Sequence, residues 1–170
     1  MNYRIIGAIL VILSSGGMGF SLAAAHKKEV NTLKQLLRAL DFMACELEYR
    51  LPPLDELCYL AGGQVSGAVN RFFSALAMQL RQQVDTDARR CVEIVLKQQT
   101  DLSPKTAREL HLLGKSLGRF DLAGQISGIR SVKELCERDL QGLQADQATR
   151  LRTYRTLGIC AGIALVILFI

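Results

Sequence analysis

The chain has 170 residues, of which 49% are hydrophobic and 6% aromatic, and its formal net charge is +5. This length fits one domain with short attached segments. The positive charge is concentrated near the two ends, because residues 41–149 hold 13 Lys and Arg against 15 Asp and Glu. Basic residues confined to the edges of apolar segments are typical of membrane proteins. They argue against a nucleic-acid partner, which needs a basic face on the folded domain.

The first predicted element is an N-terminal membrane anchor over residues 1–26. Residues 5–25 carry no charge, and a helix of about 21 residues, roughly 30 Å long, can cross the apolar core of a bilayer. A cleavable signal peptide is the alternative, with the three alanines at 23–25 as its cleavage site. The length of the apolar run favours the anchor, and so do the basic residues after it. These are Lys27, Lys28, Lys34 and Arg38.

Residues 27–155 are predicted to form an all-α domain, a six-helix antiparallel bundle. Leucines three and four residues apart over 33–51 predict an apolar stripe along the first helix, which Pro52 and Pro53 end. Similar stripes over 65–80 and 122–143 predict the third and last helices. The connections between these segments are short, as antiparallel neighbours require.

Capping residues predict where three of these helices begin. Asp85 or Thr86 is expected to cap the fourth helix. Ser103 followed by Pro104 has the residue types of a cap and a first helical position, so it is expected to start the fifth. Asp121 is expected to cap the last helix, which can continue unbroken toward the C-terminus.

The last predicted element is a C-terminal membrane segment over residues 156–170. Residues 157–170 carry no charge, but about 14 residues span only roughly 21 Å, which is short for a crossing. The alternative is a tail buried against another protein. Tyr154 and Arg155 can extend the usable length at the membrane interface, which favours a span. Basic residues beside both membrane segments place the intervening domain in the cytoplasm.

Small residues recur at a spacing of four in both membrane segments. This spacing lets the backbones of two helices approach closely within a lipid bilayer. We therefore expect these positions to pack membrane helices together. They are Ser15, Gly19 and Ala23 in the first segment and Gly158 and Gly162 in the second.

The residue types that most enzymes need are scarce, so no catalytic, cofactor-binding or metal-binding residue is predicted. His26 and His111 are the two histidines of the chain. The run from Gly114 to Ser116 resembles the end of a phosphate-binding loop, but Glu109 stands where that loop requires glycine. The five cysteines form no C-x-x-C pair and are expected to be reduced and buried. These are Cys45, Cys58, Cys91, Cys136 and Cys160.

Two stretches of the central domain carry a resemblance to a known family. The first, 46–54, contains Glu46, Tyr49, Pro53 and Leu54, and the second, 113–125, contains Gly114, Gly118, Asp121 and Gln125. Together with the order of anchor, helical domain and apolar tail, they resemble the stage III sporulation protein AB family. That family is similar to the cytoplasmic domain of the type II secretion F platform protein, which is a six-helix bundle.

The resemblance implies a non-enzymatic platform or assembly subunit of the channel or secretion-like complex between mother cell and forespore. It further implies a location in the mother-cell membrane facing the forespore. The implied partners are a cytoplasmic ATPase of the same operon, other membrane subunits of the channel and the lipid bilayer. Self-association as a homo-oligomer stays open, and nucleic acid is not an expected partner. A general membrane-anchored helical scaffold without a secretion link is the alternative.

Five of the family residues have a structural interpretation beside the one of direct partner contact. Gly114 and Gly118 can close the fifth helix and make a tight turn. Asp121 can serve as a helix cap. Tyr49 and Gln125 can satisfy buried hydrogen bonds. We expect the structural interpretation to hold more often, because caps and turns of this kind are common.

Overall fold

The structure, a computed structural model, describes the backbone of residues 2–82, 87–118 and 121–169 and the side chains of 25–82, 87–118 and 121–145. Over this range the chain forms six helices and no strand, which confirms the all-α prediction. The helices are α1 (Asn2–Tyr49), α2 (Leu54–Gly63), α3 (Gly67–Arg81), α4 (Ala88–Gln98), α5 (Pro104–Ser116) and α6 (Leu122–Phe169).

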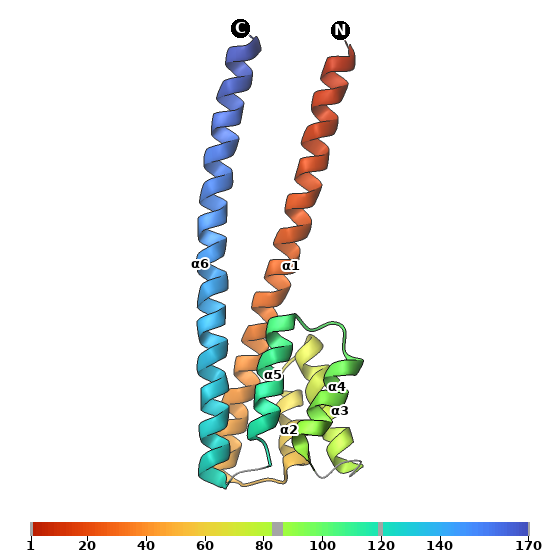
Figure 1. Ribbon diagram of the computed structural model, residues 1–170, viewed down its shortest axis with the longest axis vertical. Coiled ribbons are helices and arrows are strands. Elements are labelled where there is room, and N and C mark those ends of the chain that lie inside the picture. The colour runs from red at the N-terminus through yellow and green to blue at the C-terminus, as the bar shows by residue number, and fades with distance from the viewer. Residues whose placement is uncertain (1, 83–86, 119–120, 170) are drawn as a thin grey trace.

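Two long helices dominate the molecule. α1 and α6 have 48 residues each, roughly 70 Å at the usual helical rise. They run antiparallel and extend together well beyond the short helices α2 to α5 (Figure 1). Both chain termini therefore lie at one end of the molecule, and the bundle lies at the other. The predicted domain boundaries at residues 26 and 155 fall inside these continuous helices.

Contacts between α1 and α6 fix the register of the two long helices. Lys133 Nζ lies 2.6 Å from Asp41 Oδ1, and Arg130 forms an ion pair with Glu48. Farther from the bundle, His26 Nε2 donates a hydrogen bond to the Leu143 carbonyl oxygen at 3.1 Å. The pairing thus continues beyond the short helices, toward the two chain ends.

Among the residues that the structure describes in full, no helix combines the length and the hydrophobicity needed to cross a membrane. Apart from residues 25 and 26, the predicted membrane segments 1–26 and 156–170 lie outside that range. The predicted membrane-packing residues lie outside it too. They are Ser15, Gly19, Ala23, Gly158 and Gly162.

The core fills the space between α1, the short helices and the first part of α6. Phe72 and Phe73 are fully buried at its centre, with ring centroids 5.3 Å apart in an edge-to-face arrangement. The stripe predicted over 33–51 is buried from Leu33 to Leu47. Leu51 departs from the prediction and is 60% exposed. It follows the end of α1 and has φ 50°, so it no longer follows the helical spacing.

Two of the three predicted helix starts are confirmed. Ser103 Oγ accepts a hydrogen bond from Thr106 N–H at 3.2 Å, and Asp121 Oδ1 accepts one from Gly124 N–H at 3.1 Å. The prediction for the fourth helix is wrong, because Asp87 caps it by accepting from Arg89 N–H at 3.0 Å. Ala88, the first residue of this helix, is buried in the core.

Candidate interaction site at the base of the bundle

The two family stretches come together at the end of the bundle opposite the chain termini, where α1 ends and α6 begins (Figure 1). A Cβ atom added at Gly118 would lie 3.6 Å from Leu54 Cδ2, so residues far apart in sequence are neighbours here. We call this end the base of the bundle. It is defined by Tyr49, Leu51, Leu54, Gly118 and Leu122.

Apolar side chains at the base are open to solvent. Tyr49 is 81% exposed, Leu51 60% and Leu122 39%, and they are three of the five large hydrophobic residues that are exposed in the described part of the chain. Tyr49 therefore does not satisfy a buried hydrogen bond, which removes one interpretation of this residue. A group of exposed apolar side chains is a feature of protein-contact surfaces.

Several family residues shape the base instead of presenting a surface. Pro53 holds the N-cap position of α2, and Asp121 caps α6. Gly118 has φ +75°, a conformation that residues with a Cβ adopt only at a cost. Gln125 is half-buried one turn into α6, and its N–H donates to the Asp121 carbonyl oxygen at 2.9 Å. Leu54 is partly buried against the core.

Glu46 and Glu48 differ in exposure, as their spacing of two residues on a helix predicts. The Glu46 side chain is 16% exposed and lies 3.7 Å from Arg50 Nη1. The Glu48 side chain is 39% exposed and pairs with Arg130 of α6.

Gly114 does not close α5, contrary to the prediction, because the helix continues to Ser116. It allows close packing of two helices. A Cβ atom added there would lie 2.9 Å from Val92 Cβ of α4, closer than two such atoms approach in real structures. Gly114 is therefore a packing residue between α4 and α5, and Gly118 alone makes the left-handed turn.

Replacing Gly118 with alanine is expected to lower the free energy of unfolding by about 1–2 kcal/mol, because φ +75° forces the new Cβ against the backbone. Chemical denaturation of a fragment spanning residues 27–155 measures this loss. Gly63→Ala is the control, since among the described residues nothing lies within 4 Å of its added Cβ. Equal stability of the two variants would contradict the strained turn.

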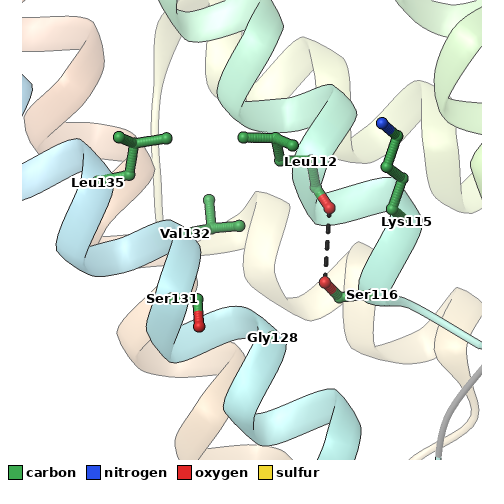
Figure 2. Close-up of a pocket in the computed structure, with 7 residues that line it drawn as sticks. All are labelled: Leu112, Lys115, Ser116, Gly128, Ser131, Val132 and Leu135. Atoms are coloured by element: carbon green, nitrogen blue, oxygen red, sulfur yellow. Dashed lines mark hydrogen bonds between the residues drawn. The ribbon is translucent and has the colours of Figure 1, made fainter.

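A shallow cavity of about 340 Å³ lies above the base, between α5 and α6. Leu112, Val132 and Leu135 point toward one another across it, and Ser116 lies beside Gly128 at its lower end (Figure 2). Ser116 Oγ donates a weak hydrogen bond to the Leu112 carbonyl oxygen at 3.5 Å. A Cβ atom added at Gly128 would lie 2.4 Å from Ser116 Cβ, so α5 and α6 approach each other closely at this point.

Glu109 of α5 is the most unusual side chain of the described region, and the sequence interpretation missed its environment. It is 0% exposed, and neither carboxyl oxygen makes a hydrogen bond within the described part of the chain. Burial raises the pKa of this carboxyl to about 7. Its spacing from the buried residues Thr106, Leu110 and Leu113 follows the apolar stripe of α5, and this signal could have placed it in the core.

The described cysteines are free thiols, as predicted. Cys58, Cys91 and Cys136 are buried, whereas Cys45 is exposed. Burial, with a smaller effect of Asp55, raises the pKa of Cys58 to about 12, so this thiol is unreactive near neutral pH. Within the residues described, no group of His, Cys, Asp and Glu is placed to hold a metal ion.

Comparisons with known proteins agree on one family. The family model described as "Stage III sporulation protein AB" matches residues 4–170. A curated protein, "Stage III sporulation protein AB" of Bacillus subtilis (strain 168), is 26% identical over 168 residues, which is 97% of this chain and 98% of the relative. The solved structure of a stage III sporulation protein AB (SpoIIIAB) has a TM-score of 0.61 and 23% identity. It covers 72% of this chain and 98% of the solved one, and it shows that the fold is shared.

Proposed function

Because the chain belongs to the stage III sporulation protein AB family, we propose that it is a membrane-anchored assembly subunit of a sporulation channel or secretion-like complex. The family gives it a role in sporulation. In the finer proposal, the helical domain is cytoplasmic, catalyses no reaction, and uses the base of the bundle to bind a cytoplasmic ATPase of the same operon. Its membrane segments contact lipid and other membrane subunits between mother cell and forespore.

The observation that carries this proposal is the arrangement of α1 and α6. They extend side by side from one end of the bundle (Figure 1), and their outer parts coincide with the uncharged stretches 5–25 and 157–170. With both stretches in a bilayer, two helices attach the bundle to the membrane, and the base is the end of the bundle farthest from it. The exposed Tyr49 and Leu51 then lie at the end of the bundle that is open to a cytoplasmic partner.

The membrane arrangement is tested by labelling Cys45, which is exposed on the bundle. A membrane-impermeant maleimide is expected to leave Cys45 unlabelled in intact protoplasts and to label it after lysis. Cys160→Ser is introduced first, so that the buried Cys58, Cys91 and Cys136 are the only thiols left besides Cys45. Labelling of intact protoplasts would overturn the cytoplasmic placement, and release of the protein by alkaline washing would overturn the anchors.

ATPase binding is tested by calorimetry between the full chain in detergent and the purified ATPase of the same operon. Tyr49→Ala combined with Leu51→Ala is expected to weaken binding at least about tenfold, because tyrosine is one of the residues that dominate the energy of protein interfaces. Tyr59→Ala is the matched control, since Tyr59 is also exposed but lies on α2 beside Arg81 of α3. No binding by the unmodified chain would favour a membrane scaffold without a secretion link.

A further inference from the structure

The contact between α5 and α6 contains a buried carboxyl group whose neutral form the fold favours. Glu109 is fully buried, and its oxygens face the Cys136 thiol and the Asp139 carboxyl without a well-formed hydrogen bond. An ionised carboxylate without a partner is very unfavourable in an apolar interior. Water or a structural change must therefore accompany loss of its proton.

The groups around Glu109 offset a negative charge only in part, because the Cys136 thiol and Arg108 favour the ionised form whereas Asp139 opposes it. From α6, Cys136 and Asp139 face it, and on α5 Arg108 is its neighbour. Arg108 Nη2 already donates to Asp139 Oδ2 at 3.3 Å, and its side chain is 60% exposed. Burial raises the pKa of Cys136 well above its usual range, so this thiol stays neutral. Asp139 would repel an ionised Glu109.

Packing next to Glu109 leaves room for movement. The cavity of about 340 Å³ begins near Leu112, less than one helical turn along α5. Leu112, Val132 and Leu135 line it without filling it (Figure 2). The tight contact of Ser116 with Gly128 lies at the far end of this cavity, near the base. The residues of α5 that line the cavity come from its second half, so packing against α6 is loose between Glu109 and the contact of Ser116 with Gly128.

We propose that the α5–α6 contact is a pH-sensitive joint, closed while Glu109 keeps its proton and opening around Glu109 when that proton leaves. This inference does not depend on the proposed function, because it concerns only the helical domain. It gives the bundle a second conformation in which α5 separates from the helix that continues toward the C-terminus.

The direction of the pH effect follows from the two pKa values. Burial raises the pKa of Glu109 from 4.5 to about 7, with the Asp139 carboxyl adding to the shift. The closed form therefore binds a proton that the open form has lost between these values, and the closed form weakens as the pH rises from about 4.5 to 7. From pH 6 to pH 8, these pKa values predict about a tenfold increase in the opening equilibrium.

Hydrogen exchange of the full chain in detergent tests the joint. At pH 6 and pH 8, corrected for the intrinsic exchange rate, residues 105–112 are expected to show about a tenfold greater opening at pH 8, while α3 is unchanged. Glu109→Gln keeps the shape of the side chain without an ionisable group, so it should abolish the difference. Glu134→Gln is the matched control, because its side chain is 68% exposed on α6.

A second variant covers the case in which Glu109→Gln folds poorly. Asp139→Asn removes the repelling carboxyl and frees Arg108. The pKa of Glu109 in the closed form should therefore fall, and the tenfold difference between pH 6 and pH 8 should shrink. Equal exchange of residues 105–112 at both pH values would overturn the proposal. So would a pH difference that persists unchanged in Glu109→Gln.

Discussion

Replacing Gly114 with valine is expected to lower the free energy of unfolding by about 3 kcal/mol. The added Cβ would lie 2.9 Å from Val92 Cβ and 3.0 and 3.1 Å from its two methyl carbons. Val92 is 0% exposed, and a β-branched side chain on a helix has one strongly preferred rotamer, so it cannot turn away. α4 and α5 must separate instead, which removes buried contacts from the core.

A double-mutant cycle identifies this contact as the cause. Val92→Ala alone is expected to cost about 2 kcal/mol through the cavity it creates. Combined with Gly114→Val, it should cost at least about 1 kcal/mol less than the sum, because it removes the two methyl groups that clash. Urea unfolding of the 27–155 fragment, which holds every buried core residue of the described region, measures all three variants.

The same experiment separates two interpretations of a family residue. A large loss of stability with rescue by Val92→Ala means that Gly114 is needed for packing. Unchanged stability together with loss of ATPase binding would mean that Gly114 lies in the partner interface, and it would contradict the packing account. The two results cannot be confused, because stability is measured without the partner.

Local sequence signals predicted the helices well because they depend on residues close together in the chain. Ser103, Pro104 and Asp121 act within one helical turn, so their positions in the sequence were sufficient. The fourth helix was misplaced because Asp85, Thr86 and Asp87 are all good caps. Residue type does not choose among them, and in the structure Asp87 is the cap, directly before the buried Ala88.

The candidate site was only partly predictable for the same reason. The family stretches named Tyr49 and Gly118 but gave no sign that Tyr49 would be exposed or that Gly118 would lie near Leu54. Glu109 follows the apolar spacing of α5, yet a charged residue at such a position is usually an outward-facing one. Its burial depends on how α5 and α6 pair, which no single helix encodes.

Two glycines of α6 provide the clearest test of that pairing. Gly128→Ala is expected to destabilise the bundle by about 2 kcal/mol, because the new Cβ would lie 2.4 Å from both Cβ and Oγ of Ser116. Gly142→Ala in the same helix is expected to stabilise it by about 0.5–1 kcal/mol, since alanine is the better helix former. Among the described residues, nothing lies within 4 Å of an added Cβ at Gly142.

The opposite signs of these two effects make the comparison robust, because both variants add one methyl group to one helix. Thermal or urea unfolding of the 27–155 fragment measures them side by side. Ser116→Gly in the Gly128→Ala background should recover part of the loss, because it removes both clashing atoms. If Gly128→Ala were as stable as Gly142→Ala, α5 and α6 would not approach each other at Ser116. The opening of α5 around Glu109 would then lack the close contact of Ser116 with Gly128 that holds the end of α5 to α6.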